Sequence, residues 1–239
     1  MGFELTTADR RLLILLAALV LVFILWNIPQ LDFVLYPFRL FVTYVHEAGH
    51  GTAALLTGGR FLGFEIFANG AGQAITAGGS RLLILPAGYL GAALFGAILF
   101  YLNNRFHYSR ALSVVLGVGL VIFSVLFGRI SMLSLVVGLV FGGLLIVLGR
   151  RVNEYINNLV LNLLAVLTGL NAVLDVWYLV GNSGASLGAV RNDAAAFSEQ
   201  VFPLPGAVWA LLWAGIAVVM LGAAVWLSVI RPRRRQRDD

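Results

Sequence analysis

Apolar residues fall into long runs, and most charged residues lie between them. Seven such segments can be distinguished, at residues 12–28, 38–57, 82–102, 111–128, 130–149, 156–180 and 207–230. A run of about 20 apolar residues is long enough to cross the hydrocarbon core as a helix. Only Gly128 and Arg129 separate the fourth and fifth segments, so the pattern fits six spans or seven. We therefore predict an all-α polytopic membrane protein with about six to seven transmembrane helices.

The connection between the second and third segments has the pattern of a β-hairpin. Residues 58–80 contain two short strand-like runs, 61–67 and 73–77, on either side of an Asn69-Gly70 pair. An Asn-Gly pair between two such runs is a strong signal for a tight turn. We expect a short hairpin directly after the second helix.

The whole chain, residues 1–239, is predicted to form a single integral membrane domain. Residues 181–205 are rich in Gly, Ser, Ala and Asn and predict a loop before the last span at 207–230. The chain ends in an arginine-rich tail at 231–239. Such a tail is typical of an anchor beside one face of a membrane.

The composition excludes several kinds of protein. Hydrophobic residues make up 60% of the chain and charged residues only 11%, which is too apolar for a soluble domain. The net charge is +5 and all 16 basic residues are Arg. They are spread between apolar runs, so no nucleic-acid partner is expected. Because the chain has no Cys, disulfides and thiolate ligands are excluded, and a metal site must use His and carboxylates.

Two imidazoles and a carboxylate lie inside the second apolar segment, in the stretch HEAGH at residues 46–50. On a helix, His46 and His50 share one face, one turn apart, and both can reach a single metal ion. Glu47 is offset around the helix, where it can act on water as a general base. Ionisable groups within a span are costly and mark a functional site by default. The stretch therefore predicts a metal site with Glu47 as its catalytic residue.

A catalytic zinc site usually has three protein ligands and one open position. With no Cys and with His107 in a separate loop, the third ligand should be a carboxylate. Asp175 lies within a long later apolar run, and metal coordination would remove the cost of burying it. We therefore predict His46, His50 and Asp175 as ligands of Zn²⁺. Asp193 is the next candidate for the third position.

With these residues in place, the chain resembles the site-2 protease family of intramembrane zinc metalloproteases, and most of all its small bacterial and plant branch without a PDZ domain. The resemblance rests on HEAGH, on TGGR at 57–60 with the hairpin, on PAGYLG at 86–91 and on LDV at 174–176. It spans most of residues 40–180. It implies a metalloprotease-like core at about 38–180, an extra C-terminal span, and a multi-pass protein of a bacterial cell membrane.

The resemblance also implies an enzyme that hydrolyses peptide bonds in or near transmembrane segments, so the expected partners are a membrane-protein substrate and the lipid bilayer. A helical substrate must unwind first, and a hairpin edge can supply replacement backbone hydrogen bonds by strand addition. Candidate substrate contacts are Phe64, Ile66 and Ile75 on the hairpin. Asn171, one turn before Asp175, can contact substrate or orient that carboxylate. The oligomeric state stays open.

Two other functions are compatible with the same residues. A non-catalytic membrane binding or chaperone-like homologue could keep the metal site, but a pure binder has no need of Glu47. A metal or ion transporter could use the same groups as a transit site, but the chain lacks the paired broken helices common in transporters. Membrane orientation also stays open, because Arg10 and Arg11 compete with the tail arginines for the cytoplasmic side if there are seven spans.

Overall fold

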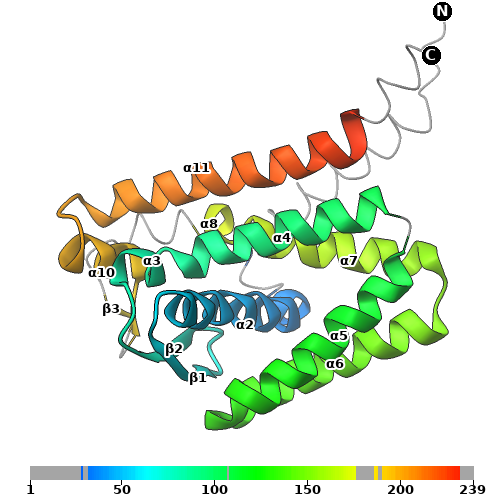
Figure 1. Cartoon of the computed structure of the whole chain (residues 1–239), viewed down its shortest axis with the longest axis horizontal. Coiled ribbons are helices and arrows are strands. Elements are labelled where there is room, and N and C mark those ends of the chain that lie inside the picture. The colour runs from blue at the N-terminus through cyan, green and yellow to red at the C-terminus, as the bar shows by residue number, and fades with distance from the viewer. Residues whose placement is uncertain (1–27, 29–31, 107, 176–185, 188–189, 232–239) are drawn as a thin grey trace, which may run out of the picture. The chain divides into compact units, whose positions relative to one another are not determined.

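The computed structural model describes residues 28, 32–106, 108–175, 186–187 and 190–231 (Figure 1). The chain divides into two units, Met1–Pro37 and Phe38–Asp239. The description below concerns the second unit, which contains nearly all the described residues. The first predicted span, apart from residue 28, and the tail after residue 231 lie outside the described residues.

The described residues form mostly helices with two small hairpins. In chain order the elements are α2 (Asp32–Leu56), β1 (Arg60–Ile66), β2 (Gly72–Ala77), α3 (Arg81–Ile84), α4 (Ala87–Arg105), α5 (Ser109–Phe127), the 3₁₀ turn η2 (Gly128–Ile130), α6 (Met132–Arg151), α7 (Glu154–Gly169), α8 (Asn171–Leu174), β3 (Ser186–Leu187), β4 (Val190–Arg191), α10 (Asp193–Gln200), α11 (Gly206–Val225) and the π-helical turn η3 (Trp226–Ile230).

Four of the described helices are long and apolar enough to cross a membrane. They are α4, α5 with η2, α6, and α11 with η3. The chain is therefore an integral membrane protein built mainly from helices, while the count of six to seven spans stays a prediction. α7 is only 16 residues long, because the predicted segment 156–180 is interrupted at Leu170. α2 carries Arg39 and Glu47 as well as two histidines, and it is not among the four.

Small residues let these helices approach one another closely. A Cβ on Gly117 of α5 would lie 2.6 Å from the carbonyl oxygen of Gly142 on α6, and a Cβ on Gly142 would lie 2.7 Å from that of Gly117. Gly96 of α4 faces the backbone of Gly169 at the end of α7 in the same way. Such contacts are typical of helices packed in lipid, where association depends on close van der Waals packing.

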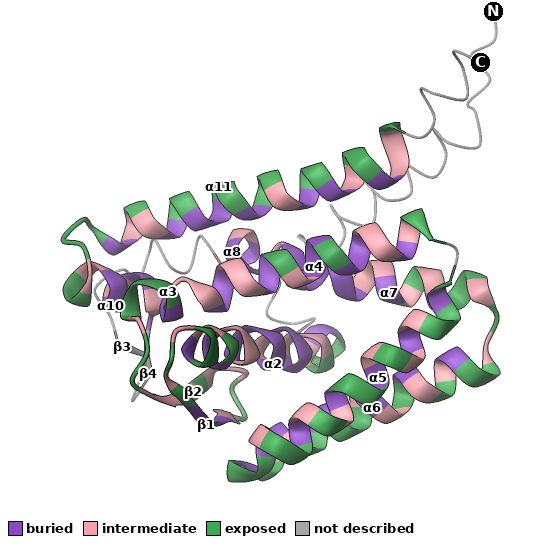
Figure 2. Cartoon of the chain, viewed as in Figure 1, coloured by how far each residue is buried: buried purple, intermediate pink, exposed green. Residues whose placement is uncertain are grey.

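The apolar side chains that are not buried point away from these helix contacts. Figure 2 shows exposed residues along the outer sides of α5, α6 and α11. Val115, Leu144 and Val219 are examples, each more than half exposed. Exposed apolar faces on helices of spanning length are what contact with lipid requires.

The predicted hairpin is confirmed. β1 and β2 are antiparallel, with Phe64 opposite Ala74. In the turn Gly70 has φ = +87°, a conformation that glycine adopts readily, and the Asn69 Oδ1 accepts a hydrogen bond from the Ala71 N–H at 3.0 Å. The local turn chemistry therefore positions the hairpin as expected.

The two edges of this hairpin differ. On the β1 side, the Ile66 N–H donates to the Ser134 hydroxyl of α6 at 2.8 Å, and β1 also contacts α5 and η2. On the β2 side, no further strand is paired within the described part of the chain. The outer edge of β2 is therefore the one at which another strand could be added.

The segment predicted as a loop before the last span contains a helix. The Asn192 side chain caps α10 by accepting from the Ala194 N–H at 2.9 Å, and three alanines follow in the first turns. Asn is a favoured N-cap, and Asp193 in the first turn suits the helix dipole. The loop prediction relied on the overall composition of residues 181–205 and did not use this start signal.

Candidate metal centre

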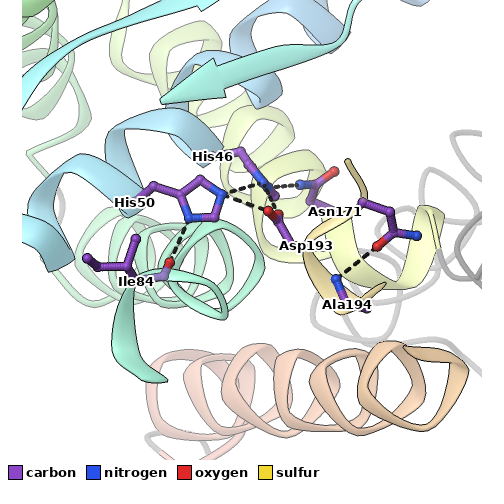
Figure 3. A network of polar contacts seen from close by, with 7 residues as sticks. His46, His50, Ile84, Asn171, Asp193 and Ala194 are labelled. Carbon is purple, nitrogen blue, oxygen red and sulfur yellow. Dashed lines mark hydrogen bonds and ion pairs between the residues drawn. The ribbon is translucent and has the colours of Figure 1, made fainter. Parts of the chain in front are cut away.

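Side chains from α2 and α10 meet beside the start of α4 (Figure 3). His46 Nε2 lies 2.9 Å from Asp193 Oδ2 and 3.1 Å from His50 Nε2, and His50 Nε2 lies 3.2 Å from Asp193 Oδ2. Their side chains are 11%, 8% and 19% exposed for His46, His50 and Asp193. Among the described residues they form a group that could hold a metal ion.

The spacing and chemistry of these atoms fit zinc. Ligands at about 2.0–2.1 Å in a tetrahedron are about 3.3–3.4 Å apart, slightly more than the observed separations. The Nδ1–H of neutral His50 donates to the Ile84 carbonyl at 2.7 Å, so its Nε2 carries a lone pair. That lone pair faces a carboxylate oxygen and a second imidazole nitrogen. A cation between the three acceptors would satisfy all of them at once.

The Ile84 carbonyl is available because the helix breaks there. Ile84 is the last residue of α3, and the final carbonyls of a helix have no partner within it. Pro86 lacks an N–H and disfavours a continuous helix from α3 into α4. Hydrogen bonds of this kind fix the orientation of a metal-binding imidazole. The PAGYLG stretch therefore contributes to the site through the helix break at its first residue.

Asn171 contacts the other imidazole. Its amide nitrogen lies 3.2 Å from His46 Nδ1, and the residue is only 4% exposed. If the amide is rotated so that its oxygen faces the ring, it accepts from Nδ1–H and leaves the Nε2 lone pair directed at Asp193. Asn171 was predicted beside Asp175 or a substrate, and the structure instead places it against a histidine.

Asn171→Leu is expected to lower zinc affinity by about 10–100-fold, the usual cost of losing a partner that orients a ligand. Asn171→Asp keeps an acceptor for His46 and should retain most of the affinity. Chelator competition on the purified variants measures both dissociation constants. Equal affinity in wild type and the Leu variant would contradict an orienting role.

Asp193 reaches the site because α10 is fixed on the last span. The Phe197 ring lies 4.6 Å from Trp209 and 5.6 Å from Trp213 between centroids. Without a bound metal, the two Nε2 atoms can carry protons and donate to Asp193. Burial alone would raise the pKa of the Asp193 carboxyl, but the charge of a protonated His50 and these hydrogen bonds hold it well below its usual range. The group is therefore anionic. The span at 207–230, expected as an addition to the core, supports one of the three metal-binding groups.

Asp175 does not join this group. It follows the short helix α8 and is half-buried, and its N–H donates to the Asn171 carbonyl at 3.0 Å. Asp175 was chosen because it lies within the long apolar segment 156–180, and the structure interrupts that segment at Leu170. The three potential ligand atoms that the structure brings together therefore come from His46, His50 and Asp193, and not from Asp175. The run Asn-Asp-Ala-Ala-Ala at 192–196 is a helix start signal that could have identified Asp193.

Glu47 lies between the metal-binding group and the hairpin. A Cβ on Gly72 of β2 would be 2.5 Å from Glu47 Oε1, and the backbone of Ala74 hydrogen-bonds the Glu47 carboxylate. Glu47 is 4% exposed, and its Oε2 is buried without a hydrogen-bond partner among the described residues. Burying an oxygen without a hydrogen-bond partner costs free energy. A water molecule between Glu47 Oε2 and a bound metal would satisfy that oxygen.

The proposed substrate contacts on the hairpin are not equivalent. Phe64 is 0% and Ile66 2% exposed, and the Phe64 ring packs edge-on against Tyr44 with centroids 4.8 Å apart. These two side chains lie in the core and support the strand. Ile75, on β2, is half-buried and is the better placed of the three to contact a substrate.

Gly88, the second residue of α4, closes the site opposite the hairpin. A Cβ there would lie 2.5 Å from His50 Nε2 and would also overlap the His46 ring. Gly88→Ala should displace the imidazoles and reduce zinc per chain, although Ala itself favours the helix. Gly119→Ala on α5, where a Cβ meets open space, is the matched control. Undiminished zinc in Gly88→Ala, measured by atomic absorption, would contradict the placement of this wall.

Comparison with known proteins identifies a family for the chain. The model of a family described as Peptidase M50B-like matches residues 14–224. This range includes α2 with its two histidines and Glu47, and α10 with Asp193. No curated protein and no solved structure matches the chain.

Proposed function

Since the chain belongs to the Peptidase M50B-like family, as its resemblance to site-2 proteases indicated, we propose that it is an intramembrane zinc metalloprotease. Its substrates would be other membrane proteins, cleaved in or near their transmembrane segments, and its location a bacterial cell membrane that it crosses several times. One observation carries this proposal. Glu47 is buried, its Oε2 has no hydrogen-bond partner among the described residues, and its carboxylate interacts electrostatically with His46, His50 and Asp193, whose ligand atoms converge.

The residues that would hold zinc are His46, His50 and Asp193. The Ile84 carbonyl and Asn171 orient the two rings, and Asp193 supplies the negative charge. When bound, zinc supplies Lewis acidity that lowers the pKa of water and polarises a carbonyl. When Zn²⁺ is bound, two neutral imidazoles and one carboxylate do not fully neutralise its charge. The net positive charge that remains favours that chemistry.

Glu47 would be the general base. Its Oε2 can take a proton from water and then give it to the nitrogen of the departing peptide. The backbone of Ala74 holds the carboxylate in place, so the base is oriented by the hairpin. A binder or chaperone would need the metal-binding group but not a carboxylate placed in this way.

The outer edge of β2 is the proposed docking site for an unwound substrate. Because the Ala74 backbone contacts Glu47, this edge runs beside the base. Backbone groups alternate in direction along an antiparallel strand, so a peptide added here would place its backbone near Glu47. Ile75 would contribute side-chain contact. Strand addition at this edge would therefore bring the peptide bond to be cleaved close to the base.

Hydrolysis of casein by the detergent-purified chain tests the proposal. Casein is chosen because its extended backbone removes the need to unwind a helix. Hydrolysis that stops with a zinc chelator and returns with added zinc is the expected result. Zinc binding without hydrolysis of casein, or of a membrane-embedded substrate, would favour a non-catalytic homologue. Zinc flux into proteoliposomes would favour a transporter.

A further inference from the structure

The hydroxyl of Thr43 forms a hydrogen bond outside its own helix. Helix hydroxyls commonly donate to the carbonyl four residues earlier, and in this chain Ser124, Thr168 and Ser228 do so at 2.6–2.7 Å. The Thr43 hydroxyl, on α2, donates instead to the Gly70 carbonyl in the turn of the hairpin, at 2.6 Å. This bond ties the hairpin turn directly to α2.

The bond is made one helical turn before the proposed base. Thr43 and Glu47 are four residues apart and share one face of α2. Gly72, the first residue of β2, lies against both side chains, because a Cβ there would be 2.6 Å from Thr43 Cγ2 and 2.5 Å from Glu47 Oε1. Two residues later, the backbone of Ala74 hydrogen-bonds the Glu47 carboxylate. The hairpin therefore meets a single turn of α2 at Gly70, Gly72 and Ala74.

The two strands of the hairpin are held by different parts of the protein. On β1, Ile66 pairs with Gly72 across the hairpin and donates its N–H to Ser134 of α6 at 2.8 Å, and the Phe64 side chain is fully buried. β1 is thus anchored in the core. β2 is positioned on α2, and the Thr43 hydroxyl supplies the side-chain hydrogen bond that fixes the turn at which β2 begins.

We propose that Thr43 is a positioning residue, whose hydroxyl holds the outer edge of β2 in place relative to Glu47 and so sets which bond of a docked peptide faces the base. This inference rests on the proposed function, in which an unwound substrate adds to that edge. Successive residues of a strand are about 3.3–3.4 Å apart. A shift of β2 by a fraction of that distance would move the docked bond away from the base, and a displacement of about 1 Å can cost about 10²-fold in rate.

Thr43→Val tests the hydroxyl alone, because Val has nearly the same shape. We expect kcat for casein to fall about tenfold or more, with zinc per chain unchanged. KM should change by less than about twofold, because the strand edge keeps its backbone groups. Thr43→Ser keeps the hydroxyl and should restore most of kcat. Unchanged kcat in the Val variant, equal losses in the Val and Ser variants, or a parallel loss of zinc would overturn the proposal.

Gly72→Ala tests the same contact from the hairpin side. The added methyl group would overlap Thr43 Cγ2 and Glu47 Oε1, so the strand and the base must separate. The expected result is again a lower kcat with zinc retained. Gly119→Ala, where a Cβ meets open space, is the control. Full activity in Gly72→Ala would overturn the proposal.

Amide hydrogen exchange tests the role of Thr43 without any catalytic readout. In the turn, the Phe67 N–H donates to the Ala71 carbonyl and the Gly70 N–H to the Phe67 carbonyl. In the full-length, detergent-purified Thr43→Val chain, exchange over residues 67–72 should be about fivefold faster than in wild type or Thr43→Ser, with α5 and α6 unchanged. Equal exchange in all three chains would overturn the proposal. If wild type hydrolyses no substrate, the proposed function fails, while exchange still decides whether Thr43 holds the hairpin.

Discussion

Glu47→Gln is expected to abolish hydrolysis while leaving zinc content at the wild-type level. The substitution keeps the size of the side chain and removes only the ability of Oε2 to take a proton. General-base catalysis contributes roughly 10²–10⁴-fold, so the loss should fall in or above that range. Casein hydrolysis and zinc per chain, measured on the same preparation, provide both quantities.

The paired readout separates three outcomes. Loss of hydrolysis with zinc retained supports the role of Glu47 as the base. Loss of both would mean that Glu47 supports the metal site instead. Unchanged hydrolysis would exclude Glu47 as the base and contradict the proposed function, because no other carboxylate among the described residues lies on the same turn of α2 as the two histidines.

Asp193→Ala is expected to cause the largest loss of zinc outside the two histidines. Its Oδ2 is within 3.2 Å of both imidazole nitrogens, and removing it leaves two neutral ligands. The loss of affinity should exceed the roughly 10–100-fold cost of a change in the surrounding shell, and so exceed that of Asn171→Leu. Chelator competition ranks the two variants directly.

Asp175→Ala and Asp193→Asn are the matched controls for this prediction. Asp175→Ala removes a carboxylate that directly follows α8 and lies outside the group, and it should retain zinc. Asp193→Asn keeps the shape of the side chain but not its charge, and should weaken binding. Zinc lost in Asp175→Ala and kept in Asp193→Ala would restore the original ligand prediction and contradict the structure at this position.

The parts of the site that the sequence predicts correctly depend on local geometry. Four-residue spacing puts His46 and His50 on one face of any helix. Asn69-Gly70 fixes a turn whatever surrounds it. Both features follow from the backbone alone, so the structure reproduces them without help from distant residues.

The remaining features depend on long-range packing, which spacing does not encode. Asp193 is 143 residues after His50 and reaches it only because Phe197 is held by two tryptophans of α11. The break at Leu170 similarly separates Asp175 from the helix α7, which begins the apolar segment 156–180. Apolarity alone suggested the segment 156–180, and it did not reveal that break.

The hairpin shows the same limit on a smaller scale. Strand alternation predicts that Phe64 and Ile66 share a face, and they do. It cannot tell whether that face meets a substrate or the protein's own core. The rings of Tyr44 and Phe123 pack against Phe64 and settle the matter in favour of the core.

X-ray absorption at the zinc edge of the purified, zinc-loaded chain tests the central claim most directly. The account predicts one zinc per chain, with light N and O neighbours at about 2.0–2.1 Å and the outer-shell scattering of two imidazoles. Asp193→Ala should remove this signal, and Asp175→Ala should not. Absence of bound zinc in the wild-type chain, or a bound zinc without imidazole scattering, would contradict the assignment of His46, His50 and Asp193 as one metal centre.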